Sequence, residues 1–481
     1  MILACAALGL LVLEILTPRE QHRFIPYVAI ISLAIVLLAV IGNFHLTYGS
    51  DPLFGGLIRL SWFGQIARVF FLLSSLLVCF LGTICLPRTR MPRVEFYHIV
   101  LVVTAALMLL AQSNHFVMFF VALETVTIGF YILVSYFRDN ALTLEAGLKY
   151  LVLGALSSAI MLFGIVMIYG AVGRVEIGGV IHTGFEYETV AAFLQQNPDS
   201  FLATVGALLV IGGVAFKIGA FPFQIWIPDV YQGAPTPVTA FLAVSSKAAG
   251  FAVLLTLVLH VFAPLAGVLK PALSGLAAAT ILIGNLSALS QRNAKRLMGL
   301  SGVSHAGYLL IGVVAALTVP SAVTAVWFYL FTYLLASMAV FGVMAYVAGT
   351  DDTLQELDQY EKLARERPLL GAVLAVGVGS LAGIPPLAGF MGKLLIFVAA
   401  FQAHLYGLLA VAIAGVILSI YYYFGWIKAA FFETWSPNPS TAARPVPAAV
   451  PLAGRLVLVA LALATVVLGF YQTPLASWLV P

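Results

Sequence analysis

Five ionisable side chains, Glu124 and four lysines, interrupt stretches of sequence that are otherwise almost entirely apolar. The lysines are Lys149, Lys217, Lys247 and Lys393. A charge at the centre of a membrane helix costs about 2.5–3.5 kcal/mol on insertion scales, and such residues are usually functional. Carboxylates and ammonium groups bind and release protons, so these residue types predict proton transfer through an apolar layer.

Glu124 lies near the middle of "FVMFFVALETVTIGFYILV", a segment without a cation that could neutralise it. A structural ion pair with another helix is the alternative to a functional carboxylate. Lys149 follows Glu145 by four residues, in the order that favours an ion pair on one helix. A local salt bridge is therefore the alternative to a role in proton transfer for Lys149.

Lys217 and Lys393 both lie beside prolines. Lys217 precedes Pro222, and Lys393 follows "GIPPLAGF". A proline removes a backbone donor and clashes with the preceding turn, while glycine lets the backbone bend. Freed backbone groups at membrane depth are tolerated only where protein or water covers them. We therefore expect two interrupted helices with partly hydrated sites where both lysines exchange protons; purely structural roles are the alternative.

Lys247 and His305 lie in apolar segments without an adjacent proline. Lys247 is flanked by Ser245, Ser246 and alanines, and small residues permit close helix approach. It is expected to be an intermediate station for protons, or else a lysine satisfied by hydroxyls and carbonyls. His305, in "SGVSHAGYLLIG", suits proton relay because imidazole titrates near neutral pH; a neutral packing histidine is the alternative.

The composition indicates what elements hold these residues. The 481 residues are 62% hydrophobic and 9% charged, against about 25% charged in soluble proteins. Apolar runs near the roughly 20 residues that span a bilayer recur along the whole chain. We predict an all-α polytopic membrane protein with about fourteen transmembrane helices, centred near residues 9, 34, 75, 104, 125, 158, 212, 250, 281, 309, 336, 385, 418 and 463.

Basic residues are distributed unevenly between the predicted loops. Loops after odd-numbered helices hold fourteen Lys and Arg residues, whereas loops after even-numbered helices hold three, Arg59, Arg174 and Lys270. By the positive-inside rule the odd loops face the cytoplasm, which places both termini on the non-cytoplasmic side. Met1–Leu16 is expected to be the first membrane helix because no positive leader precedes its apolar run.

The two interrupted helices also predict internal symmetry. Helices 4–8 and 9–13 form two five-helix blocks, each with an interrupted fourth member, helices 7 and 12. An odd number of helices inverts the second block, as in many transporters. We expect N-terminal helices at residues 1–94, a first repeat at 95–265, a second repeat at 266–435, and a C-terminal loop and helix at 436–481.

Several classes of cofactor and partner are not expected for this chain. Its three cysteines, Cys5, Cys79 and Cys85, are scattered, without the spacing of iron–sulfur or zinc ligands. No G-x-G-x-x-G fingerprint follows a strand pattern. The net charge of +4 is spread through loops, which predicts no nucleic-acid binding.

Long motifs resemble a known family. "KIGAFPFQIWIPDVYQGAPTPVTAFLAVSSKAAGF" is similar to the signature of the antiporter-like membrane subunits of respiratory complex I, and in particular of subunit N of bacterial NADH–quinone oxidoreductase, called subunit 2 in mitochondria. The resemblance runs from about Tyr97 to Trp435. It includes "ALETVTIGFYIL", "EAGLKYLVLGALSSAIMLFGIVMIYG", "QRNAKRLMGLSGVSHAGYLLIG" and "GIPPLAGFMGKLLIF".

The resemblance implies roles for matching positions. Glu124 would pair with Lys217, Lys247 and His305 would continue a central hydrophilic axis, and Lys393 would be its terminal lysine. Lys149 also matches a family lysine. Gln224 departs from the family, which usually has histidine after "PF".

The resemblance further implies proton translocation coupled to electron transfer in other subunits of an NADH:quinone oxidoreductase. This chain would hold no redox centre, and flavin and iron–sulfur clusters would lie in partner subunits. Expected partners are other membrane subunits, including antiporter-like neighbours, and lipids of the bacterial inner membrane; quinone is used by the complex but is not expected to bind here. The alternatives are a subunit of a multi-subunit sodium/proton antiporter and an autonomous secondary transporter.

Overall fold

The structure is a computed structural model. It describes residues 2–18, 22, 24–44, 52–88, 94–177, 180–348, 351–432 and 449–480. Several cations of the predicted loops, including Arg19, Arg23 and Arg444, lie outside these ranges, as does much of the predicted C-terminal loop.

Helices make up nearly all of the described chain. The first half contains α1 (Ile2–Leu16), α2 (Ile25–Gly42), α3 (Trp62–Cys85), η2 (Leu86–Arg88), α4 (Val94–Leu110), α5 (Phe116–Val134), α6 (Ala141–Val172), α7 (Tyr187–Gln196), α8 (Phe201–Ile218), η3 (Phe223–Trp226), α9 (Ile227–Gly233), α10 (Thr236–Phe241), η4 (Leu242–Ser246), α11 (Lys247–Thr256) and η5 (Leu257–Val261). The second half contains η6 (Ala263–Leu265), α12 (Ala266–Ala288), α13 (Ala294–Ala316), α14 (Ser321–Val347), η7 (Leu357–Tyr360), α15 (Leu363–Glu366), α16 (Pro368–Ala382), α17 (Ala388–Gln402), α18 (Tyr406–Phe431), α19 (Leu452–Phe470) and α20 (Thr473–Leu479).

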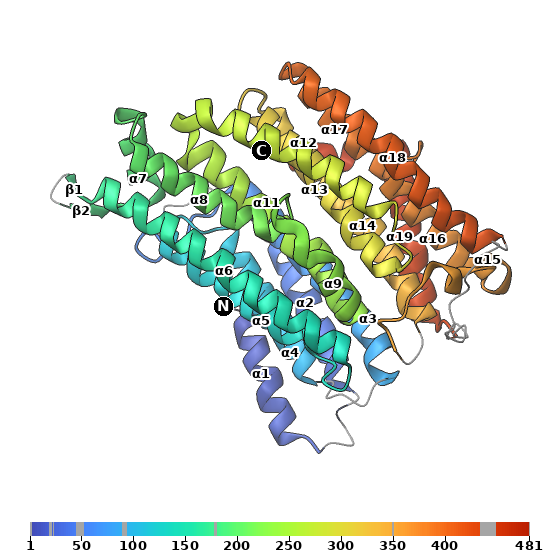
Figure 1. Ribbon diagram of the computed structural model, residues 1–481. Coiled ribbons are helices and arrows are strands. Elements are labelled where there is room, and N and C mark those ends of the chain that lie inside the picture. The colour runs from blue at the N-terminus through green and yellow to red at the C-terminus, as the bar shows by residue number, and fades with distance from the viewer. Residues whose placement is uncertain are drawn as a thin grey trace.

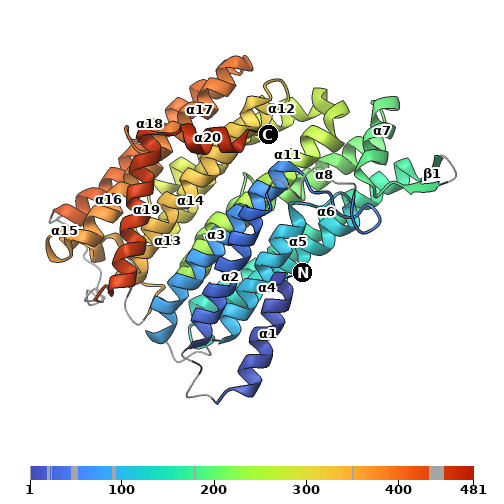
Figure 2. The same ribbon diagram turned by 180° about the vertical axis from the view of Figure 1, so that it is seen from behind.

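Within the described residues, eleven helical segments are long and apolar enough to cross a membrane. Four shorter apolar helices accompany them: α1, α4, α16 and α17. The prediction of a mostly helical, polytopic membrane protein is thus confirmed. Figure 1 shows the long helices running along a common diagonal, and in Figure 2 α2 and α3 lie on the opposite side of the bundle from α6.

The centre of the bundle is formed by α13 and α14. In the apolar, membrane-length stretch of α13 every residue is buried inside the protein, and in that of α14 94% of the residues are buried. By contrast, only about a third of the residues in the corresponding stretches of α2 and α18 are buried. Polar groups carried by α13 are therefore shielded from lipid by the surrounding helices.

The two predicted helix interruptions are confirmed. The helix α8 ends at Gly219, whose φ of 75° is left-handed, and α9 begins only after Pro222 and the short η3. In the same way α16 ends at Gly383, with a φ of 85°, and α17 begins after Pro386. Glycine takes this conformation without the penalty of a Cβ, and the following proline cannot continue a helix.

The segment Thr236–Val261 differs from the uninterrupted helix that was expected around Lys247. It runs as α10, η4, α11 and η5, and both η4 and η5 are π-helical. Such wide turns occur as single-turn bulges inside α-helices, frequently at functional sites. Lys247 is the first residue after η4.

The described part of the segment between α6 and α8 contains regular secondary structure. The strands β1 (Arg174–Ile177) and β2 (Val180–Thr183) form an antiparallel hairpin, and α7 follows. Partial burial works to raise the pKa of Glu186, but hydrogen bonds from His182 and the Thr183 backbone outweigh it and leave this pKa below its ordinary value. Figure 1 places this segment at the end of the bundle opposite α9 and α15.

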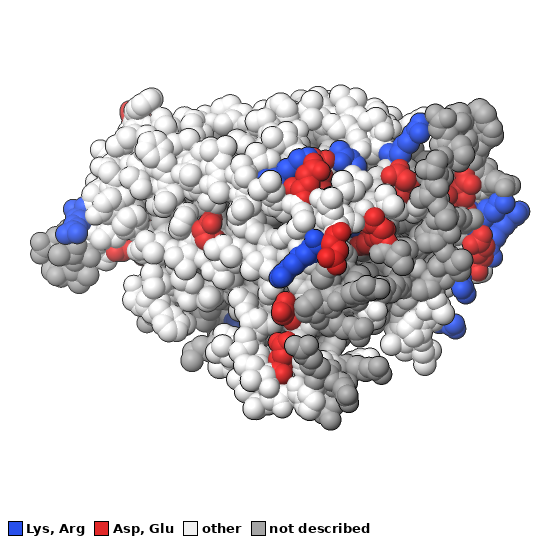
Figure 3. Space-filling view, turned by 60° about the horizontal axis from the view of Figure 1, so that its bottom comes forward, with Lys and Arg blue, Asp and Glu red and all other residues white. Residues whose placement is uncertain are grey.

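Charged side chains are rare on the visible surface. In Figure 3 they gather mainly on the side of α9 and α15, while most of the remaining surface is white. We call this end of the bundle the charged end. An uncharged surface is what a bilayer requires of the protein that it covers.

Candidate proton-transfer site

Glu124 and Lys217 are close but are not bonded to each other. The hydroxyl of Ser158, on α6, donates to the Glu124 carboxylate at 2.5 Å. The Lys217 ammonium donates to the hydroxyl of Thr127 at 2.6 Å, one turn along α5 from Glu124. Glu124 is the acidic group that acts electrostatically on Lys217. The expected direct ion pair is thus replaced by two hydroxyl contacts, which hold both ionisable groups beside the interruption after α8.

Lys247 is buried at the junction of the two halves of the bundle. Its ammonium donates to the Gly302 carbonyl of α13 at 2.5 Å and lies 5.0 Å from the centre of the Tyr333 ring. Only 3% of the residue is exposed. A cation over an aromatic face is stabilised by the ring's quadrupole, so carbonyl and ring together offset part of the cost of burial.

His305 lies one turn along α13 from Gly302 and contacts two tyrosines. Its Nδ1 is 2.5 Å from the hydroxyl of Tyr329, and its Nε2 is 3.1 Å from that of Tyr423. The residue is 2% exposed. With a polar partner at each ring nitrogen, His305 can accept a proton on one side and release one on the other.

Lys393, on α17, reaches back to the end of the other half of its interrupted helix. Its ammonium donates to the carbonyls of Leu381 and Ala382, at 2.9 and 3.0 Å. These are among the last carbonyls of α16, which have no partner within the helix and carry its partial negative charge. The Lys393 ammonium also lies 5.2 Å from the centre of the Tyr308 ring. The interruption therefore provides the acceptors that hold this lysine.

One face of α13 links the second half of the row. Gly302, His305 and Tyr308 follow one another at intervals of three residues, which places them on the same side of a helix. They contact Lys247, the two tyrosines and Lys393 in turn. Lys247, His305 and Lys393 are thereby brought together along a single buried helix.

The step between Lys217 and Lys247 runs along the contact between α8 and α11. The helices α8 and α11 pack closely where Ile218 lies against Gly250. A Cβ added at Gly250 would lie 2.5 Å from the Ile218 side chain. Lys217 precedes Ile218 and Lys247 lies three residues before Gly250. Among the described residues, no direct hydrogen bond joins these two lysines.

Lys149 is not part of this buried row. Its ammonium bonds the carboxylates of Glu145 at 2.7 Å and Asp229 at 2.6 Å, and its side chain is 41% exposed. Asp229 also accepts from Arg296 at 2.6 Å. The local salt bridge foreseen as an alternative is present, within a larger network that joins α6, α9 and α13.

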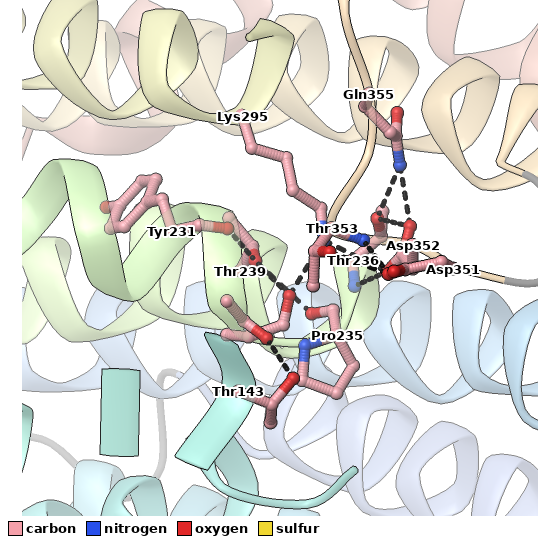
Figure 4. A network of polar contacts seen from close by, with 12 residues as sticks. Thr143, Tyr231, Pro235, Thr236, Thr239, Lys295, Asp351, Asp352, Thr353 and Gln355 are labelled. Carbon is pink, nitrogen blue, oxygen red and sulfur yellow. Dashed lines mark hydrogen bonds and ion pairs between the residues drawn. The ribbon is translucent and has the colours of Figure 1, made fainter. Parts of the chain in front are cut away.

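A buried charge network near the charged end was not anticipated from the sequence. Lys295, one of the fourteen basic residues that the sequence placed in loops after odd-numbered helices, is fully buried. It donates to Asp352 at 3.0 Å and to the Ala234 carbonyl at 2.8 Å. Asp352 also accepts from the backbone and hydroxyl of Thr236 and from Gln355, as Figure 4 shows. The network fixes the start of α10 to the start of α13. We call it the Asp352 latch.

Gln224 lies in η3, within the first interruption, and is partly exposed. Its side-chain carbonyl oxygen is buried without a hydrogen-bond partner among the described residues. The described residues also contain no group of three His, Cys, Asp or Glu side chains that could hold a metal ion.

Enlarging Gly302 tests whether the position of the Lys247 ammonium matters as well as its charge. A Cβ at Gly302 would lie 2.8 Å from Lys247 Nζ and 3.2 Å from the Tyr333 hydroxyl. We expect Gly302→Ala to move the ammonium and lower proton translocation by about tenfold, since proton transfer depends on hydrogen-bond reach. Gly299→Ala, one turn away against Ile227 and Tyr231, is the matched control. Unchanged translocation in an assembled Gly302→Ala variant contradicts this expectation.

The two interrupted helices and the buried lysines define a class of helical membrane proteins that hold ionisable groups at membrane depth. A model of the family described as NADH:quinone oxidoreductase/Mrp antiporter, transmembrane, matches residues 113–419. The chain belongs to this family.

Individual relatives agree with this assignment. NADH-quinone oxidoreductase subunit N 1 of Opitutus terrae is 61% identical over 480 residues, which cover 99% of this chain and 95% of that protein. Subunit N of Moorella thermoacetica is 35% identical over 475 residues, covering 99% and 95%.

Solved structures show the same fold. A chain of respiratory complex I from Thermus thermophilus with bound aureothin matches with a TM-score of 0.80 and 32% identity, covering 99% of this chain and 98% of that one. A chain of the Mrp complex from Dietzia sp. matches with a TM-score of 0.82 at 22% identity, covering 99% and 95%, and shows the shared fold alone.

Proposed function

We propose that this chain is the proton-translocating membrane subunit of a complex I-type NADH–quinone oxidoreductase. The single observation that carries the proposal is the row of Glu124, Lys217, Lys247, His305 and Lys393, in which Glu124 is half-buried and the other four are buried. Each of these residues has a hydrogen-bond partner that holds it inside the bundle. The 61% identity to a subunit N supports the choice of complex over other members of the family.

The chain's own residues suggest how protons move. A charge change in a neighbouring subunit acts on Glu124, which in turn acts on Lys217. Lys217 then releases its proton toward Lys247, and His305 passes a proton between Tyr329 and Tyr423 toward Lys393. Close ionisable groups bind protons as a set, so each transfer alters the next. Lys149, with its exposed ion pairs, serves at the edge of the row.

The architecture proposed with this function has fourteen spans, with α16 and α17 together counted as one interrupted span. The first repeat comprises membrane spans 4–8, within residues 95–265, and the second comprises spans 9–13, within residues 266–435; these span numbers differ from the helix labels of Figure 1. The charged end faces the cytoplasm and both termini lie on the other side of the bacterial inner membrane. Electron transfer, flavin and iron–sulfur clusters belong to partner subunits, and quinone binds elsewhere in the complex.

Removing either member of the first pair tests the function. We expect Lys217→Ala and Glu124→Ala each to lower NADH-driven proton translocation about a hundredfold, the lower end of the effect of losing a proton-transfer group. The measurement is acidification of inverted membrane vesicles, with NADH oxidation by an artificial electron acceptor as the control for assembly. Normal translocation in assembled variants would refute the proposal.

A further inference from the structure

A large cavity opens at the end of the bundle opposite the charged end. Its volume is about 1160 Å³, and it is lined by the ends of α3, α4, α11, α13 and α14 together with α7. Its polar lining includes Arg59, Gln112, Glu188, Thr256 and His260. Arg59 and Glu188 are exposed and form an ion pair at 2.9 Å. Most of the remaining lining is apolar, and the exposed Arg59–Glu188 pair admits water to the cavity from the surface.

The floor of this cavity lies close to Lys247. Ala252 lines the cavity and lies five residues from Lys247 on α11, a rise of about 7.5 Å. Trp327 also lines it and lies six residues from Tyr333 on α14, a rise of about 9 Å. Since Tyr333 covers the Lys247 ammonium, both helices lead from the cavity to the same lysine.

Three aromatic rings pack together beside the cavity, on the parts of α3 and α14 that lead from it toward Tyr333. Phe70, on α3, contacts Trp327 and Phe331, with ring centres 6.3 and 5.1 Å apart. We call these three rings the aromatic plug. Beyond the plug the helices become polar again: Ser74 bonds Ser245 at 2.6 Å. Along both α3 and α14, residues that line the cavity come first, an aromatic ring of the plug follows, and a polar side chain comes next.

The plug contains an unsatisfied polar group. The indole N–H of Trp327 is buried without an acceptor among the described residues, although the residue is only 1% exposed. Buried donors normally bind protein or ordered water. This donor is out of reach of water in the cavity unless the plug opens.

From this arrangement we propose that the cavity is the aqueous path by which Lys247 releases its proton to the side opposite the charged end. When the aromatic plug opens, one N–H bond of the Lys247 ammonium breaks and its proton passes to cavity water, while the electron pair stays on Nζ. Lys217 then reloads the neutral amine. This inference rests on the proposed function and places a release point at the middle of the row rather than only at Lys393.

Thiol labelling tests access to the cavity. In a Cys5→Ala background, Thr256→Cys places a thiol in the cavity lining, and Leu282→Cys places one on the exposed apolar surface of α12 as a control. A membrane-impermeant, charged thiosulfonate is added to right-side-out or to inverted vesicles that contain the whole complex. We expect labelling of Thr256→Cys from one side only and none of Leu282→Cys. Labelling is expected to lower proton translocation about tenfold or more, because the released proton loses its acceptor.

Filling the cavity provides a second test. We expect Ala252→Phe to lower translocation by a similar factor, whereas Ala272→Phe, the same change at an exposed position of α12, leaves it unchanged. Failure to label Thr256→Cys from either side, or full translocation after labelling and in Ala252→Phe, overturns the inference. If Lys217→Ala still abolishes translocation, the release path alone is wrong; if Lys217→Ala pumps normally, the proposed function itself fails.

Discussion

Replacing Lys247 by methionine is expected to lower NADH-driven proton translocation about a hundredfold or more, the effect of removing a proton-transfer group. Lys247 is the residue through which the two halves of the row meet. Its ammonium bonds Gly302 on α13 and faces Tyr333 on α14. Methionine keeps an unbranched chain of similar length and removes only the charge and its donors, so the fold is preserved while the proton carrier is lost.

The measurement is dye-reported acidification of inverted vesicles, with the amount of assembled complex determined by native electrophoresis. Lys428→Met is the matched control, because Lys428 is an exposed lysine in the last turn of α18. We expect this control to pump normally. Full translocation by assembled Lys247→Met would exclude Lys247 from the proton path.

Replacing Asp352 by alanine is expected to destabilise the protein by about 3–5 kcal/mol, the effect of leaving a buried charge without its partner. Lys295 is fully buried and Asp352 is its only carboxylate partner among the described residues. The same substitution also removes the acceptor of the Thr236 backbone and hydroxyl. The expected result is a lower unfolding midpoint of the solubilised complex and less of it in the membrane.

Two further variants make this expectation specific. Asp139→Ala, at an exposed acidic residue, is expected to change the free energy of unfolding by less than about 0.5 kcal/mol. Lys295→Met combined with Asp352→Leu removes both charges and should recover part of the loss, because a buried pair can be replaced by apolar residues. A double variant less stable than Asp352→Ala would show that the ion pair is not the source of the effect.

The structural features that the sequence predicted correctly depend on residues that are neighbours in the sequence. The clusters of prolines and glycines next to Lys217 and Lys393 favour chain breaks at those points, whereas the isolated Pro271 lies within α12. Intramembrane lysines must be shielded from lipid whatever their partners are. The interrupted helices and the buried positions of Lys217, Lys247, His305 and Lys393 could therefore be derived from residue type and spacing.

What the sequence did not predict depends on contacts between distant segments. Lys295 and Asp352 are 57 residues apart, and nothing near either one indicates their pairing. The choice of Thr127 rather than Glu124 as the partner of Lys217 is decided by side-chain geometry across α5 and α8. The β1–β2 hairpin and α7 were likewise missed, because a short polar stretch gives little periodicity to interpret.

The wide turn of η4 makes residue spacing in this span a constraint of its own. With Thr236 anchored by the Asp352 latch, deleting one residue between 242 and 246 would convert the wide turn to an ordinary one and leave α11 in register, because a wide turn holds one extra residue. Inserting one residue there, with no second wide turn to absorb it, would rotate everything after it by about 100°. The span would stay apolar, yet Lys247 would no longer point at Gly302. A one-codon insertion that no hydropathy profile would detect would thus disconnect the two halves of the molecule.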